Sequence, residues 1–207
     1  TGANATIGHG LGVVPEFFMV KQLGSAGSNW MVYHSELGAT KNLVLDNSSD
    51  GSTSVTRWNN TEPTSTLISL GTTTAVNGSS ATYICYAFAP SQFISIGSYK
   101  NNNNANGTFV PTLSSLGIPI QPTWILTKTI ASANWFINDN KRIGYNVDNN
   151  SLFPNVTTVE ATTDVLDIVT GGFKLRTASD PNYSTSTTVY MAIGTPIIDT
   201  DGRIIAG

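Results

Sequence analysis

The sequence predicts an all-β protein made of two tandem copies of an antiparallel β-sandwich of about 105 residues, jelly-roll-like in type. Short stretches alternate apolar with polar residues and are rich in Thr, Val, Ile and aromatic residues. Gly, Asn and Ser gather between these stretches, as they do in tight turns. The chain also matches itself at a shift of 105 residues. No stretch carries a helical apolar stripe over three turns.

Alternation predicts the strands one by one. In the first half they lie at residues 17–22, 30–34, 41–45, 65–70 and 81–88. In the second half they lie at residues 93–100, 124–128, 134–137, 173–177 and 187–193. Turn-forming residues separate them at positions 24–28, 47–51, 77–78 and 101–107. One stretch, residues 160–168, is interpreted as a helix, with Asp164 in its first turn.

Matching landmarks define the two copies. At the shift of 105 residues Trp30 falls on Trp135, and Asn77 falls on Asn182. A period of this length is that of an ordinary domain, not of a solenoid repeat. We therefore assign copy one to residues 1–91, copy two to residues 92–196, and a C-terminal strand or hairpin to residues 197–207.

Copy two begins with the strand at residues 93–100, for which copy one has no equivalent because Thr1 already matches Asn106. Two explanations fit this difference. Either the chain is a piece of a longer protein, or the segment 197–207 supplies the strand that copy one lacks.

The composition excludes several classes of function. The formal net charge is -3, charged residues make up 11% of the chain, and Thr, Ser and Asn number 28, 21 and 20. Ten scattered Lys and Arg do not form the clustered basic face that neutralises phosphates, so no nucleic-acid partner is expected. No apolar run approaches the roughly 20 residues that span a bilayer, so no membrane insertion is expected.

The chain offers few groups for catalysis. It has two His, one Cys and four Glu, and neither His9 nor His34 recurs in the other copy. CxxC, HExxH, Gly-x-Ser-x-Gly and phosphate-binding glycine motifs are missing from the sequence. We therefore expect a protein that is not an enzyme, with no catalytic residue, no metal site and no cofactor.

The candidate ligand-binding residues are Trp58, Asn59, Asn60 and Glu62. They form a loop-like run that places an aromatic ring beside amide and carboxylate groups, and Trp58 has no counterpart in copy two. We expect Trp58 to be exposed, so that Trp58→Ala weakens glycan binding without unfolding the chain. Trp30 and Trp135 follow polar turns at the start of strands and are expected to fill the cores of their copies.

An ordered series of motifs carries a family resemblance. In copy one they are residues 10–21 (GLGVVPEFFMVK), 29–34 (NWMVYH), 58–63 (WNNTEP), 70–71 (LG) and 77–88 (NGSSATYICYAF). In copy two they are residues 116–117 (LG), 122–128 (PTWILTK), 134–137 (NWFI), 171–175 (GGFKL) and 190–193 (YMAI). The series resembles a β-sandwich repeat common in tail-fibre and other virion proteins of aquatic bacteriophages. Residues 138–142 (NDNKR) depart from the Tyr-His-x-x-Leu-Gly form of that repeat.

The resemblance implies a component of the phage virion, an extracellular particle, at the appendage that meets the host. Its expected partners are other virion proteins, further copies of itself in a homotrimer, and host surface glycans. The family supplies no catalytic residue.

Three functions remain open at this point. The first is a tail-fibre or receptor-binding segment that works by multivalent contact with glycans. The second is a structural head-decoration or spacer protein without ligand binding. The third is a glycan depolymerase or esterase, which the short supply of His and Glu disfavours. Exposed aromatics beside amides would indicate the first, a flat apolar face the second, and carboxylates converging in a cleft the third.

Overall fold

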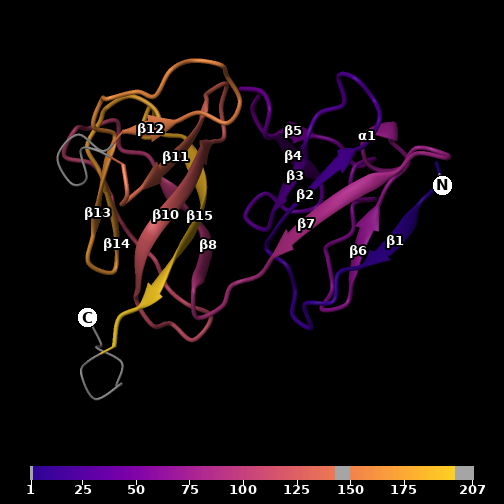
Figure 1. The fold of residues 1–207 in the computed structure, drawn as a ribbon, viewed down its shortest axis with the longest axis horizontal. Helices are drawn as coiled ribbons and strands as arrows, with labels where there is room; N and C mark the ends of the chain where they lie inside the picture. Colours follow the sequence, from indigo (N-terminus) through magenta and orange to yellow (C-terminus); the bar gives the residue numbers. More distant parts are fainter. Residues whose placement is uncertain (1, 143–149, 199–207) are drawn as a thin grey trace. The chain divides into compact units, whose positions relative to one another are not determined.

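Antiparallel strands account for nearly all regular structure in the computed structural model, which describes residues 2–142 and 150–198 (Figure 1). The chain divides into two units, Thr1–Ala89 and Pro90–Gly207. Each unit has its own sheets and its own core, so the predicted all-β, sandwich character is confirmed. Within the described residues, no helix has both the length and the apolar character needed to cross a membrane.

Unit 1 consists of a five-stranded sheet, a two-stranded sheet and one helical turn. The five-stranded sheet has the order β5-β4-β3-β2-β7, and β1 pairs with β6 in the smaller sheet. The elements are β1 (Ala5–Gly8), β2 (Phe17–Gln22), β3 (Met31–His34), β4 (Lys41–Val44), β5 (Ser52–Thr53), β6 (Leu67–Leu70), α1 (Thr74–Asn77) and β7 (Tyr83–Phe88).

Strand β2 lies between β3 and β7 and turns two large apolar residues, Phe18 and Val20, to the core. Phe18 lies opposite Tyr33 on β3, and Val20 lies opposite Met31. Burying each such side chain stabilises the fold by roughly 1.5–3 kcal/mol. The core of unit 1 consists of Phe18, Val20, Met31, Tyr33, Ala39, Val44, Trp58, Ile68, Leu70 and Val76.

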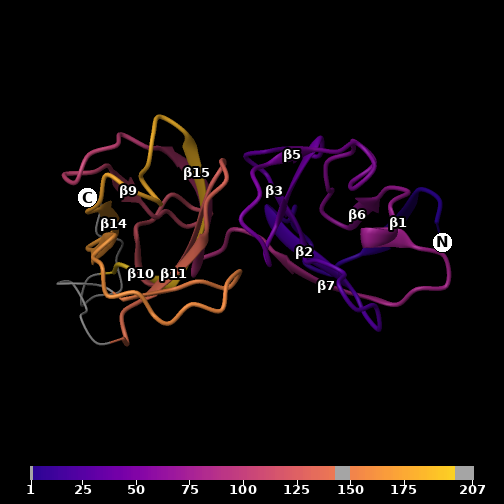
Figure 2. The ribbon, with the colours of Figure 1, turned by 90° about the horizontal axis from the view of Figure 1, so that it is seen from above.

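Unit 2 pairs a five-stranded sheet with a three-stranded one, seen on opposite sides of its core in Figure 2. The larger sheet has the order β12-β11-β10-β15-β8, and the smaller has the order β13-β14-β9. The strands are β8 (Ile94–Lys100), β9 (Phe109–Pro111), β10 (Ile120–Thr129), β11 (Trp135–Asp139), β12 (Ser151–Leu152), β13 (Leu166–Val169), β14 (Gly172–Leu175) and β15 (Thr187–Pro196).

The core of unit 2 lies between these sheets. Tyr99, Phe173 and Tyr190 meet edge-on there, with ring centroids 5.8 and 5.5 Å apart, the geometry that aromatic rings prefer. The core consists of Tyr99, Val110, Ile125, Phe136, Val165, Leu166, Ile168, Phe173, Leu175, Tyr190 and Ala192.

Each unit has a buried asparagine that ties its first segment to the end of a strand. The Asn77 Nδ2 donates to the carbonyl oxygen of Ala3, and the Asn182 Nδ2 donates to that of Asn104 at 2.9 Å. Each amide also donates to a carbonyl just after β6 or β14, at 2.9 and 2.8 Å respectively. Each side chain therefore bonds both to nearby backbone and to backbone more than 70 residues away along the chain.

The structure corrects two sequence-based expectations and bears on two others. The predicted helix at 160–168 is wrong, because Leu166–Val169 forms a strand paired with β14. Trp135 is buried as expected, whereas Trp30 is only half-buried. In unit 2, β8 pairs with β15 at the edge of the large sheet. In unit 1, β7 is itself the edge strand, and no strand among the described residues pairs with its outer side. The expected C-terminal strand falls mainly on residues 199–207, outside the described residues.

Candidate functional site

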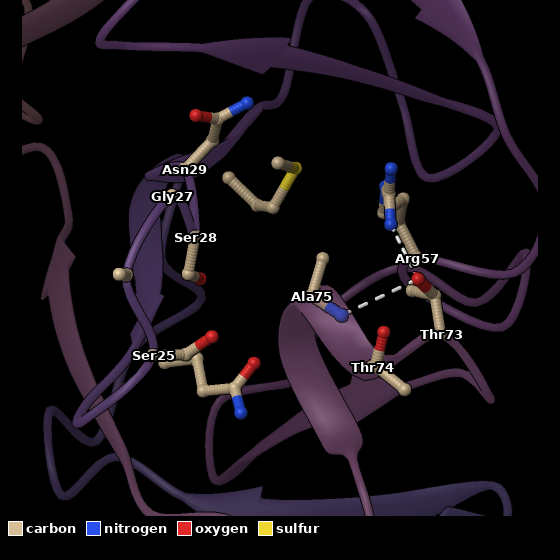
Figure 3. Close-up of a pocket in the computed structure, with 11 residues that line it drawn as sticks. Ser25, Gly27, Ser28, Asn29, Arg57, Thr73, Thr74 and Ala75 are labelled. Carbon is tan, nitrogen blue, oxygen red and sulfur yellow. Dashed lines mark hydrogen bonds between the residues drawn. The ribbon is translucent and has the colours of Figure 1, made fainter.

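A polar pocket of about 390 Å³ lies in unit 1, between the loop that joins β2 to β3 and the first turn of α1 (Figure 3). Gln22, residues 25–29 and Met31 form one wall, and Arg57 with residues 73–75 forms the other. Figure 3 shows the labelled loop residues on one side and Arg57, Thr73 and Thr74 on the other. The volume falls in the range of roughly 300–1,000 Å³ usual for small-molecule sites.

Two glycines and a lysine shape the loop wall. Gly24 and Gly27 have φ angles of 70° and 79°, which glycine adopts without the steric cost of a side chain. The Ser28 backbone N–H donates to the carbonyl oxygen of Ser25 at 3.3 Å, and the Lys21 ammonium donates to the carbonyl of Ser28. These contacts hold the loop's hydroxyl and amide groups around the pocket.

The opposite wall is held through Arg57. Its Nη1 donates to Thr73 Oγ1 at 2.5 Å, and the same oxygen caps α1 by accepting from the Ala75 N–H at 3.4 Å. The Arg57 carbonyl accepts from the Gly71 N–H at 2.8 Å. Position 71 requires glycine, because a Cβ there would lie 2.0 Å from the carbonyl oxygen of Thr56.

Arg57 supplies the charge of the pocket. It is the one charged side chain among the described residues that line the pocket. Burial lowers the pKa of its guanidinium, which nevertheless stays protonated at neutral pH. The Arg57 Nε and the Ser28 Oγ are both buried and have no hydrogen-bond partner among the described residues. The pocket thus carries one positive charge, and its walls contain two buried polar atoms without a partner among the described residues.

Trp58 is not available to a ligand, and the prediction of an exposed ring is wrong. Its side chain is 0% exposed and belongs to the core of unit 1. The ring meets Phe18 edge-on at a centroid distance of 4.8 Å, and its Nε1 donates to the carbonyl oxygen of Lys41 at 3.0 Å. The indole can be buried at little cost, because its one polar group, the Nε1–H, is hydrogen-bonded.

Glu62, predicted to contact ligand, binds two neighbouring segments of its own unit. The Tyr33 hydroxyl donates to Glu62 Oε2, and the Ala39 N–H donates to Oε1 at 2.7 Å. Burial and then the Glu62 hydrogen bond and charge raise the pKa of Tyr33. The carboxylate therefore has a structural task.

Asn59 and Asn60 lie together at a second, open pocket of about 460 Å³ in unit 1. Both are exposed and have positive φ angles, 52° and 47°, a conformation that asparagine tolerates better than most residues. Of the four predicted residues, these two share a pocket. Sequence reasoning missed Arg57, although it precedes Trp58 and is the single arginine in the first 89 residues.

The groups that could support acid–base chemistry lie away from the Arg57 pocket. His34 is buried against the edge of Phe17, and burial followed by the charge of Glu36 raises the pKa of Glu16. No cluster of three His, Cys, Asp or Glu that could hold a metal ion occurs in residues 2–142 and 150–198. The pocket's described lining contains none of these residue types.

Comparison with known proteins yields one match. Over residues 1–195 the sequence matches the family described as a domain of unknown function, DUF7483. No curated protein and no solved structure matches the chain. The matched range runs across both units.

Proposed function

The chain belongs to the DUF7483 family, and for this member we propose a role in a bacteriophage virion as a tail-fibre or receptor-binding segment that attaches to host surface glycans. The observation that carries the proposal is the Arg57 pocket, where hydroxyl and amide groups of Ser25, Asn29 and Thr74 can bond to sugar hydroxyls. Met31 and Ala75 add apolar surface for the C–H face of a sugar ring. The resemblance of the motif series to tail-fibre repeats and the weakly charged composition support the same role.

In this proposal the protein binds and does not catalyse, and its two units are copies of one jelly-roll-like sandwich. Strand β14 begins 105 residues after β6, the shift at which the sequence matches itself. We match β3-β2-β7 of unit 1 with β11-β10-β15 of unit 2, which follow the same order in their sheets. Position 162, which corresponds to Arg57, is Thr, so unit 1 alone would carry the guanidinium pocket.

A glycan array tests the proposal. The chain is displayed in several copies on streptavidin, because single sugar sites bind weakly and multivalent display raises the apparent affinity. We expect binding to at least one glycan, loss of that binding in Ser25→Phe, which fills the pocket, and retention in Asn60→Gly, which alters the second pocket. Asn60→Gly keeps a residue that tolerates positive φ. Binding to no glycan, or equal binding by Ser25→Phe, would overturn the proposal.

One observation favours the alternative of a structural head-decoration or spacer protein. An apolar hollow of about 250 Å³ lies in unit 2, lined in part by Phe109, Leu113 and Ile197. The Phe109 and Leu113 side chains are 47% and 43% exposed, so this surface could pack against another virion protein. If this surface packs in the particle, the double variant Phe109→Ser and Leu113→Ser should fail to incorporate into particles. If the protein serves attachment instead, particles should assemble with the double variant in place.

We also propose a homotrimer as the assembly. Light scattering of the purified chain measures its solution mass directly. A mass near three chains supports the fibre role, and a monomer favours the decoration role.

A further inference from the structure

Arg57 differs from the other arginines of the described residues. Arg142 and Arg176 each form ion pairs with carboxylates, the first at an N–O distance of 2.8 Å to Glu160. None of the ion pairs in residues 2–142 and 150–198 involves Arg57. Its hydrogen bond from the side chain goes to a neutral hydroxyl, that of Thr73. Among the described residues, Arg57 thus lacks the carboxylate partner that Arg142 and Arg176 have.

The guanidinium is therefore only partly satisfied. It carries five N–H donors, and its Nε is buried with no partner among the described residues. Burial lowers the pKa of Arg57, as expected where solvent is removed and no anion compensates. An anion that enters the pocket would recover this lost solvation through charge-assisted hydrogen bonds.

The geometry of the group selects among anions. A planar guanidinium matches a planar carboxylate through two parallel hydrogen bonds. A phosphate monoester brings nearly two negative charges, and the described lining offers one cation to meet them. The rest of the described lining is neutral, with hydroxyl and amide groups at Gln22, Ser25, Ser28, Asn29 and Thr74. These groups suit the hydroxyls of a sugar that bears the carboxylate.

We infer that the pocket takes an acidic sugar, with the sugar carboxylate paired to the Arg57 guanidinium and the ring hydroxyls bound by the β2–β3 loop and Thr74. This inference rests on the proposed glycan attachment and names the class of glycan. The single positive charge of Arg57 among neutral groups would select a sugar with one carboxylate. The net charge of -3 of the chain would disfavour non-specific binding of polyanions.

The test compares methyl glucuronide with its neutral counterpart, methyl glucoside, by NMR titration of the labelled full chain. We expect the glucuronide to bind at least tenfold more tightly and to shift the Arg57 Nε–Hε resonance. Arg57→Gln should remove this preference, and Arg57→Lys should retain only part of it because lysine lacks the planar fork. Lys100→Gln, which removes one positive charge from an exposed side chain of unit 2, should change nothing.

The outcomes separate this inference from the proposed function. Equal binding of glucuronide and glucoside, or a preference that survives in Arg57→Gln, overturns the acidic-sugar assignment and leaves glycan attachment standing. Tighter binding of a sulfated or phosphorylated sugar than of the glucuronide also overturns it. Absence of binding to every glycan on the array overturns the proposed function itself. Unfolding curves of the Arg57 variants, matched to the unmodified chain, exclude misfolding as the cause of lost binding.

Discussion

Replacing Trp58 by alanine should remove a large part of the stability of unit 1. Its fully buried side chain would leave a cavity, and such Trp→Ala changes cost about 3–5 kcal/mol. The edge-on contact with Phe18 accounts for about 0.5–1.5 kcal/mol of ring packing. The carbonyl of Lys41 would lose the indole N–H, at about 1–3 kcal/mol if left unpaired. These contributions overlap, and we expect about 4–5 kcal/mol in total, against about 5–15 kcal/mol for a whole domain.

Urea unfolding combined with hydrogen exchange measures this loss unit by unit. Peptides from β2 should lose protection in Trp58→Ala, while peptides from β10 keep theirs because they belong to a separate core. Trp58→Phe, which keeps a ring but loses the N–H, should cost about 2 kcal/mol. Trp30→Ala is the control, since this half-buried ring lies at the surface near Tyr86, and it should cost roughly 1–2 kcal/mol. A cost for Trp58→Ala below about 1 kcal/mol, or equal to that of Trp30→Ala, would refute a core-filling indole.

Three further predictions concern other buried groups. Asn182→Ala should destabilise unit 2 by about 2–4 kcal/mol in urea unfolding, because the fully buried amide would no longer donate to the carbonyls of Asn104 and Thr177. A cost as small as that of Asn104→Ala, at an exposed position, would contradict this. Burial and the charge of Glu36 raise the pKa of Glu16, so the stability of the fold falls as pH rises through that pKa. Glu36→Gln removes the repulsion between the two carboxylates and should raise the urea midpoint at pH 7 but not at pH 4. Equal gains at both pH values would disprove the coupling. Burial raises the pKa of the Cys85 thiol to about 11, which lowers the fraction of reactive thiolate at pH 8. Iodoacetamide should therefore alkylate Cys85 about 100-fold more slowly in the folded chain than in urea. Similar rates in the two states would show an accessible thiolate.

The parts of the fold that the sequence predicted are those with a strong local pattern. β2 opens with four apolar residues, Phe17 to Val20, and was predicted with its observed ends, Phe17 and Gln22. β1 (Ala5–Gly8) escaped prediction because it is short and partly exposed, and its conformation depends on pairing with β6. Residues 160–168 were misread because Asp164 resembled a first-turn residue, while Leu166 to Val169 pair with β14.

The candidate site was predicted less well, because the local sequence does not show which way a loop side chain points. A polar run around Trp58 indicates a loop, but whether a loop side chain points inward depends on the space between distant strands. Trp58 points inward and Asn59 outward, in adjacent positions. Arg57 could have been found from its singularity in the first unit, although the absence of a carboxylate partner is visible only in three dimensions.

The order of strands in the two large sheets has a consequence for synthesis on the ribosome. In unit 1, β2 waits about 60 residues for its partner β7, and in unit 2, β10 waits about as long for β15. Strand β8 waits longest, because β15 begins 87 residues after Lys100, the last residue of β8. At translation rates of about 5–20 residues per second, β8 stays unpaired for roughly 4–17 s. The nascent chain is therefore most open to mispairing at β8, whose sole neighbour in the described sheet is the last strand made.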